Sequence, residues 1–369
     1  MTILCRPKKR VLRSGRQLGW IGVDVGTSVI KLAQVERAGG QWRLACSLVV
    51  STGNDPDSMP LSAGDGSLAR LLSTGLQESV GFRGRRAALA LPLSTMELRT
   101  LQLPAGTDDE LRTMIDQELS LAAGDLTADR LFDFWDTGLR RDSEKEAMRD
   151  LAVLSISSQS AEHAAEELLA AGLNCQVFDG VPFALARAVT MESASAGSAP
   201  VVALDWGFKS VTLVVVDDGK PSFVRSFRDC GVGRIVRSLC NEFGLTVPEC
   251  GQLLGRYGIP HPAADNRGTG LQRMIYDLAA EPIASLLNEL EKTFTYLRRQ
   301  GPNLMPERIL LFGGGATINN CAPLLSSRIG IPVKRWQPAW LAGENDHSRC
   351  ARNALFGPAA ALSALSFEA

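Results

Sequence analysis

The strongest constraint on the fold of this chain is a short segment that occurs twice. Residues 21–36 read IGVDVGTSVIKLAQVE and residues 202–217 read VALDWGFKSVTLVVVD, and the two align without a gap, with Asp24 on Asp205. Each copy is an apolar strand, an Asp-x-Gly turn and a second apolar strand, which predicts a hairpin. Two hairpins of this kind in one chain indicate two similar α/β domains that face one ligand.

The residue types in the two turns indicate a phosphate ligand. Glycine lets backbone N–H groups approach an anion closely, and the first turn adds two hydroxyl groups. The two carboxylates would repel phosphate and instead suit Mg²⁺, which prefers oxygen ligands. A single Asp-Gly is more often an ordinary hairpin turn, but two copies in one register favour the phosphate site. The candidate binding residues of the turns are Asp24, Gly26, Thr27, Ser28, Asp205, Gly207 and Lys209, with Asp24 and Asp205 on the metal side.

A third segment combines a buried strand with a run of glycines. Residues 309–316 read ILLFGGGA and precede a predicted helix. Glycines at such a junction allow a ligand to lie against bare backbone near a helix N-terminus. The candidate binding residues here are Gly313, Gly314, Gly315 and Ala316.

The repeat also predicts the organisation of the chain. Residues 88–156 interrupt it with several strands and a polar helix, and residues 191–199 are small and polar, as in a linker. The predicted units are a basic flexible N-terminal tail, 1–18; a first lobe, 19–87 and 157–190; an inserted subdomain, 88–156; a hinge linker, 191–199; a second lobe, 200–231 and 301–365; and a helical outer subdomain of the second lobe, 232–300.

The three glycine-bearing segments, in this order, resemble the phosphate and adenosine loops of the superfamily of actin, the Hsp70 chaperones and the sugar kinases. Within that superfamily the chain is most similar to the PilM family of type IV pilus assembly proteins, over about residues 19–362. The most specific match is EPIASLLNELEKTFTYLRRQGPNLMPERILLFGGGA, residues 281–316. The resemblance implies an α/β, actin-like two-lobe fold of duplicated RNase H-like domains with an inserted subdomain. It also implies ATP and Mg²⁺ as ligands.

The resemblance implies partners as well. A PilM-like protein is expected in the cytoplasm, peripheral at the inner membrane. There it would dock the cytoplasmic N-terminal peptide of a PilN-like, membrane-anchored pilus or secretion partner on the side of its inserted subdomain. Self-association is also open. The basic tail, with no acid in residues 1–18, is either a solvated tail or a weak contact with anionic lipid.

Two positions depart from the family pattern. The family's Asp-x-Glu-Pro is replaced here by Asp179-Gly180-Val181-Pro182, and valine can neither orient a water nor take its proton. The family's Ala-Glu-x-x-Lys is replaced by Cys250-Gly251-Gln252-Leu253-Leu254, which lacks the two side chains expected near ribose and adenine. We therefore expect hydrolysis to be slow or absent and nucleotide affinity to be reduced.

Composition excludes several classes of protein. Charged residues at 21% and apolar residues at 45% are typical of a globular protein, and the net charge of −1 gives no basic field for nucleic acid. The eight cysteines form no C-x-x-C pair, which argues against zinc and favours reduced thiols. No apolar run is long enough to span a bilayer, and no signal peptide is expected.

Alternative functions remain within the same superfamily. A small-molecule kinase would need a carboxylate base, for which Asp179 is the only candidate. A chaperone-like ATPase would need a substrate-binding domain, and an FtsA-like division protein would end in an amphipathic membrane helix that LSALSFEA does not resemble. Lys31 follows the first turn and could contact phosphate, although a solvated strand lysine is the preferred interpretation.

Overall fold

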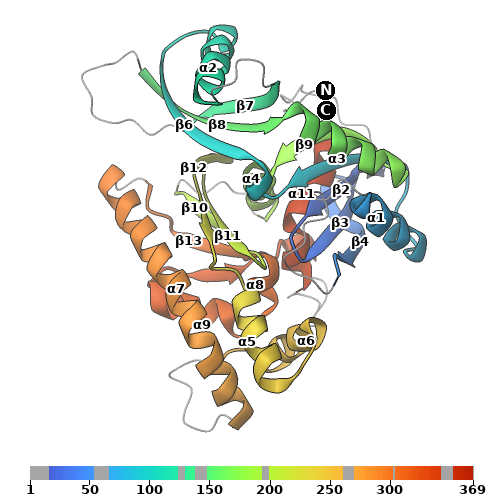
Figure 1. Ribbon diagram of the computed structural model, residues 1–369, viewed down its shortest axis with the longest axis vertical. Coiled ribbons are helices and arrows are strands. Elements are labelled where there is room, and N and C mark those ends of the chain that lie inside the picture. The colour runs from blue at the N-terminus through green and yellow to red at the C-terminus, as the bar shows by residue number, and fades with distance from the viewer. Residues whose placement is uncertain are drawn as a thin grey trace.

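The computed structural model describes residues 16–53, 66–123, 129–137, 148–192, 199–260, 270–301, 304–341 and 352–368. These residues form two lobes around two large sheets, with a smaller sheet at one end of the molecule (Figure 1). Most of the predicted tail (1–18) and hinge linker (191–199) lies outside the described residues, so both stay predictions.

The first lobe is built on a mixed sheet whose central strand runs into the first Asp-x-Gly turn. Its strand order is β1-β3-β2-β5-β9, and β4 pairs along the other edge of β3. Helices α1 and α3 cover one face of this sheet through leucine and alanine side chains. The elements are β1 (Gln17–Leu18), β2 (Ile21–Val25), β3 (Val29–Ala38), β4 (Gln41–Ser51), α1 (Ser67–Glu78), β5 (Arg86–Leu91), α3 (Ser158–Ala170) and β9 (Asn174–Gly180).

The second lobe repeats this topology. Its order, β12-β11-β10-β13-β14, corresponds strand by strand to β4-β3-β2-β5-β9. In both sheets the first three strands are antiparallel neighbours and the last two run parallel to the central one. The predicted duplication is therefore confirmed. The strands are β10 (Val201–Trp206), β11 (Ser210–Asp217), β12 (Lys220–Arg228), β13 (Arg308–Phe312) and β14 (Val333–Arg335).

Two helices lie between the two large sheets and join the lobes into one core. Helix α4 (Val181–Glu192) packs on β10, β11 and β12, whereas α11 (Gly357–Ala364) packs on β2, β3, β5 and α4. Every residue of α11 is buried. The approach is close because α11 consists of small residues and because a Cβ at Gly22 would lie 1.9 Å from the Ala359 carbonyl oxygen. Ser363 Oγ accepts the N–H of Val35 at 2.9 Å and donates to the carbonyl of Trp20 at 2.5 Å.

The inserted segment forms a sheet of its own. Its order is β6-β8-β7, and α2 packs on it around a separate apolar cluster that includes Ile115. The indole of Trp135 on β7 donates to the Pro221 carbonyl of β12 at 2.5 Å and meets the ring of Phe183 on α4 edge to face at 4.7 Å. Residues 88–91 of the predicted insertion belong to β5. The elements are η1 (Leu93–Thr95), β6 (Glu97–Pro104), α2 (Asp108–Ala123), β7 (Arg130–Asp136) and β8 (Met148–Ser157).

The outer part of the second lobe is helical, with one interruption that was not predicted. The segment 232–258 holds two helices, α5 (Gly233–Phe243) and α6 (Val247–Tyr257), because Gly244 at φ 64° ends the first and Thr246 with Glu249 caps the second. Both lie at the far end of the molecule from the inserted sheet (Figure 1). The helix predicted at 271–300 is α7 (Gly270–Gln300).

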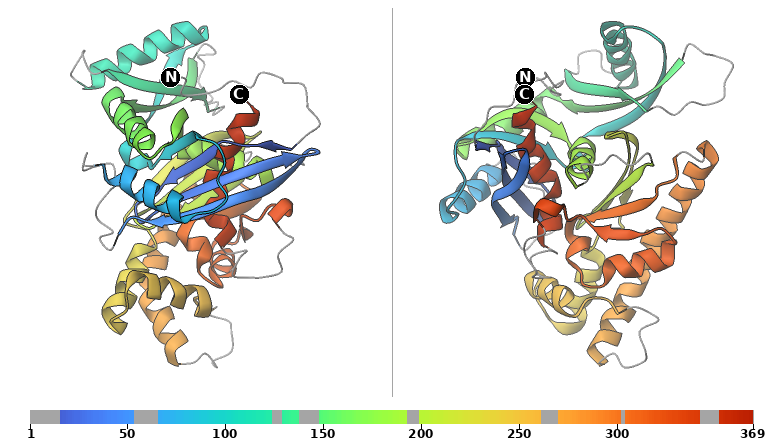
Figure 2. Two further views of the ribbon diagram at one scale, coloured as in Figure 1. Left: turned by 90° about the vertical axis from the view of Figure 1, so that its right-hand side faces the viewer. Right: turned by 180° about the vertical axis from the view of Figure 1, so that it is seen from behind.

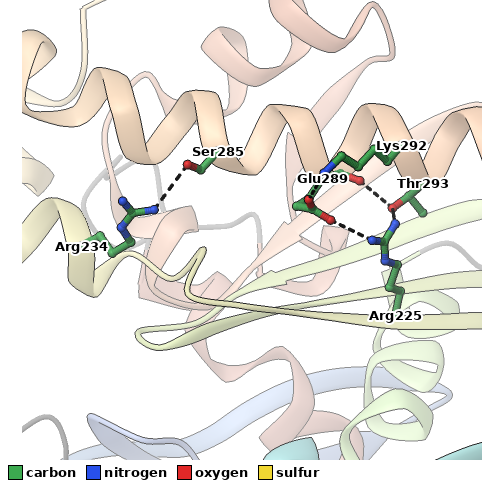
Figure 3. A network of polar contacts seen from close by, with 6 residues as sticks. All are labelled: Arg225, Arg234, Ser285, Glu289, Lys292 and Thr293. Atoms are coloured by element: carbon green, nitrogen blue, oxygen red, sulfur yellow. Dashed lines mark hydrogen bonds and ion pairs between the residues drawn. The ribbon is translucent and has the colours of Figure 1, made fainter.

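Helix α7 runs along the outer side of the second sheet (Figure 2). Figure 3 shows an ion pair and a hydrogen bond that join it to the sheet: Arg225 of β12 donates to Glu289 at 2.8 Å and to Thr293 at 2.7 Å. The remaining elements are α8 (Gly313–Thr317), α9 (Cys321–Ile329), η3 (Ala339–Leu341), η4 (Ala354–Phe356) and η5 (Leu365–Phe367).

Candidate functional site

The two Asp-x-Gly turns face a common cleft of about 270 Å³ between the lobes. They have the same backbone geometry: the Gly26 N–H donates to the Val29 carbonyl at 3.0 Å, and the Gly207 N–H donates to the Ser210 carbonyl at 3.0 Å. The structure brings nine of the predicted residues to this cleft: Asp24, Gly26, Thr27, Ser28, Asp205, Gly207, Lys209, Gly313 and Gly314.

Neighbouring segments hold each turn in place. Thr52, which sequence reasoning missed, donates its hydroxyl to the carbonyls of Thr27 and Ser28 at 3.1 and 2.9 Å. The second turn is braced by the start of α5, where the Gly233 N–H donates to the Phe208 carbonyl at 2.8 Å. The loops are therefore fixed before any ligand binds, which lowers the ordering cost of binding.

The glycine run serves two different purposes. Gly313 adopts φ +73°, and a Cβ there would lie 2.2 Å from Asp205 Oδ1, so only glycine leaves room for this carboxylate. A Cβ at Gly315 would lie 2.4 Å from the indole of Trp206, and Ala316 is fully buried. Gly315 and Ala316 therefore shape the wall behind the cleft and do not line it. The run itself forms the short helix α8, whereas the helix was expected after it.

Lys31 lies inside the site, so the preferred interpretation as a solvated lysine was wrong. Its Nζ donates to Asp24 Oδ2 at 2.8 Å, and the two side chains are only 10% and 7% exposed. The hairpin register explains this contact, since Asp24 and Lys31 are directly opposed across β2 and β3. In the second hairpin the opposed pair is Asp205 and Thr212, and both line the cleft.

The charges of the site are strongly coupled. Burial disfavours the charge on Lys31, but the carboxylates of Asp24 and Asp205 outweigh burial and raise the Lys31 pKa above its ordinary value. Burial raises the pKa of Asp205 to about 6, with Lys31 opposing this rise and Asp24 adding to it. Among the described residues, none donates a hydrogen bond to the Asp205 carboxylate. Within the described part of the chain, Asp205 is thus a buried carboxyl group without a close donor.

The residues fit a cation that is held mainly by its own phosphates. No group of three or more metal-ligating side chains occurs among the described residues. Mg²⁺, however, is commonly bound by one or two carboxylates together with water and substrate phosphates. Asp205 meets this requirement best, because Asp24 is already engaged by Lys31.

The departures from the family pattern are visible in the cleft. Val181, at the start of α4, lines the cleft and presents only methyl groups. Asp179 does not line it: the carboxylate is fully buried, accepts from Arg187 at 2.6 Å and accepts the Gly180 N–H at 2.8 Å. Gly251 and Leu254 of α6 also line the cleft, as the alignment requires.

The comparison with known proteins agrees with this geometry. A family model described as the type IV pilus assembly protein PilM matches residues 22–340. The chain belongs to the PilM family. As a family member it is an actin-like type IV pilus assembly protein, which confirms the resemblance predicted from the sequence.

Solved structures show the same fold. This PilM-family chain is similar to a structure titled "PilM-PilN type IV pilus biogenesis complex", with a TM-score of 0.75 and 22% identity over 94% of this chain and 98% of the other. It is also similar to the ethanolamine utilization protein EutJ from Carboxydothermus hydrogenoformans, with a TM-score of 0.51 and 14% identity over 98% of this chain and 92% of the other. The predicted α/β, actin-like fold is therefore confirmed.

In the described part of this PilM-family chain, no helix combines the length and the apolar character that crossing a bilayer requires.

Proposed function

We propose that this protein holds Mg²⁺-ATP between its two Asp-x-Gly turns as a structural element of a type IV pilus or related secretion machine. One observation carries the proposal: turns from distant parts of the chain converge on one cleft that contains a buried lysine between two acids. The phosphates would lie against Gly26, Gly207 and Gly314, with Lys31 and Lys209 as cations. Mg²⁺, held by Asp205 directly and by Asp24 through one of the waters of the ion, would neutralise phosphate charge.

Hydrolysis is proposed to be slow or absent. In-line attack on a γ-phosphate needs a group that orients the water. Among the described lining residues the only carboxylates are Asp24 and Asp205, and Asp24 is paired with Lys31. Val181 lies at the position where the family pattern has glutamate. The kinase alternative is disfavoured, since its candidate base, Asp179, is paired with Arg187 away from the cleft.

The partner is proposed to dock on the inserted subdomain. The inserted sheet packs against the first lobe around a cavity of only about 10 Å³, which is lined by Met96, Leu131, Phe183 and their neighbours. The solved relative is named as a PilM-PilN complex. We therefore propose a membrane-anchored partner whose cytoplasmic N-terminal peptide binds along this junction and moves the inserted sheet away from the first lobe. Such binding would place the protein at the cytoplasmic face of the inner membrane. Self-association would be an additional assembly mode.

Calorimetry with ATP, with and without Mg²⁺, tests the nucleotide site. Wild type should bind, and Lys31→Met and Asp205→Asn should each lose tenfold or more of the affinity. The matched controls are Lys220→Met and Asp217→Asn, both at exposed positions of the second sheet. Phosphate release should stay near the background rate. Failure of wild type to bind ATP would refute the proposal, and rapid turnover would refute its slow-hydrolysis part.

Peptide titration tests the partner site. The cytoplasmic N-terminal peptide of the membrane partner should bind wild type and should lose affinity for Leu131→Arg. Leu169→Arg, on an exposed position of α3, is the control and should bind as wild type does. If both variants lost affinity for the peptide equally, or if neither lost any, the peptide would bind elsewhere.

A further inference from the structure

The cleft has two ends of opposite chemical character, and this contrast bears on which nucleotides it accepts. One end carries Lys31, Lys209 and the two glycine turns. The other end lies beneath α5 and α6, where the walls are Val236, Val247, Leu254 and Ile318. A triphosphate must occupy the charged end, so the base of a bound nucleotide falls at the apolar end.

The apolar end offers very little for reading a base. Among its described residues there is no amide, carboxylate or cationic side chain. Its one hydroxyl belongs to Thr317, which already donates to the Gly314 carbonyl at 2.7 Å. Both lone pairs of that oxygen remain available to accept a hydrogen bond. The N6 amine of adenine can donate to it, and the N2 amine of guanine can do the same when the base is turned over. Thr317 therefore does not separate the two purines.

The cleft also leaves space beside α6. Gly251 is exposed, and a Cβ placed on it would meet nothing within 4 Å. A base in this position keeps its polar edge in water and lies with its faces against aliphatic side chains. Contacts of this kind tolerate any base, because discrimination between bases of similar shape depends on buried polar partners.

We propose that this site is a phosphate-anchored nucleotide site without base selectivity, which accepts ATP and GTP alike. The inference rests on the proposed nucleotide function and deepens it. The energy of binding would come from Lys31 and the turns, with the base adding only apolar contact. Gly251 would set the width of the base end, because any larger side chain there enters the space that the base needs.

Calorimetry with Mg²⁺ and three probes tests the inference: ATP, GTP and inorganic tripolyphosphate. The dissociation constants of ATP and GTP should agree within about threefold, and tripolyphosphate should bind measurably. A preference of tenfold or more for one purine would overturn the inference while leaving the nucleotide function intact. If no probe binds wild type, both the function and the inference fail.

A variant in α6 tests where in the cleft the base lies. Gly251→Phe should weaken ATP and GTP by tenfold or more and leave tripolyphosphate within about twofold. Gln252→Phe, at the next and exposed position, should leave all three unchanged. Retained tripolyphosphate binding shows that the variant is folded. Equal loss of tripolyphosphate and ATP in a folded Gly251→Phe protein would show that the base does not lie beneath α6.

Discussion

Lys31 and Asp24 face each other because the turn at Gly26 sets the register of the first hairpin. Their contact is nearly sealed from water, so each charge depends on the other. The sequence contained this information, since opposed residues follow from the turn position. Treating Lys31 as an isolated strand lysine overlooked its cross-strand partner.

Lys31→Met should strongly destabilise the protein without ligand. The substitution leaves the Asp24 carboxylate buried without its cation, at a cost of about 3–5 kcal/mol in the free energy of unfolding. The double variant Lys31→Met, Asp24→Asn removes the uncompensated charge and should regain a large part of this loss. Urea unfolding at pH 7.5 measures the cycle, with Lys220→Met as the control. A double variant that shows the full sum of both single losses would contradict the pairing.

Asp205 should make stability depend on pH. Its pKa in the folded protein, about 6, lies above the ordinary 3.8, so the folded state keeps a proton that the unfolded chain has released. The stabilisation from that proton is present at low pH and is lost as the pH rises from about 4 to about 6.

Asp205→Asn should therefore be more stable than wild type at pH 7.5, by on the order of 1 kcal/mol, and this difference should vanish near pH 4. Thermal unfolding of both proteins without ligand, from pH 4 to 7.5, checks the sign. The exposed Asp217→Asn should follow wild type throughout. If Asp205→Asn were less stable than wild type at pH 7.5, the charge on the Asp205 carboxylate would not destabilise the folded protein, and this interpretation would be wrong.

At the scale of elements, the sequence predicted the strands well and the packing of glycines poorly. The hairpins were readable because each apolar run ends at an Asp-x-Gly turn. The break between α5 and α6 could also have been predicted, because Gly244 is followed by a Thr246-x-x-Glu249 capping box, but this signal was overlooked. The contact between Gly315 and Trp206 could not be predicted from the sequence, because it depends on the distance between two separate segments.

We expect one serine to attach helix α11 to the first sheet and so to contribute to the stability of the fold. Ser363→Ala removes the partner of the buried Val35 N–H and of the part-buried Trp20 carbonyl, and should cost about 1–3 kcal/mol in the free energy of unfolding. Ser366→Ala, one turn further on, should cost less than about 0.5 kcal/mol. Urea unfolding compares the two variants. Equal costs would mean that the hydroxyl of Ser363 does not fasten this helix.

At the scale of the whole molecule, the two lobes share one apolar cluster, whereas the inserted subdomain has a separate one. One cluster runs through α4, α11 and both large sheets, so the lobes are expected to unfold together. The inserted subdomain has its own cluster around Ile115. Trp135 links it to both lobes through Pro221 and Phe183, and we expect the cluster around Ile115 to unfold separately from the cluster that the lobes share.

Ile115→Ala should therefore act locally. The substitution truncates a fully buried side chain of the small cluster and should lower the free energy of unfolding of the inserted subdomain by about 2–5 kcal/mol. The rate of amide hydrogen exchange across β6, β7 and β8 should rise as a result. ATP affinity should stay within about twofold, whereas binding of the partner peptide should fall. Leu121→Ala, on the same helix and 69% exposed, is the control. Loss of ATP binding in Ile115→Ala would show that the subdomains are not independent.

The burial of α11 between the sheets has a consequence for synthesis on the ribosome. Val35 bonds to Ser363 across 328 residues, so the inner face of the first sheet gains its cover only after that further length of chain has been translated. At about 5–20 residues per second this interval lasts on the order of tens of seconds. Throughout that time an apolar surface of the nascent chain is available to chaperones and to neighbouring nascent chains.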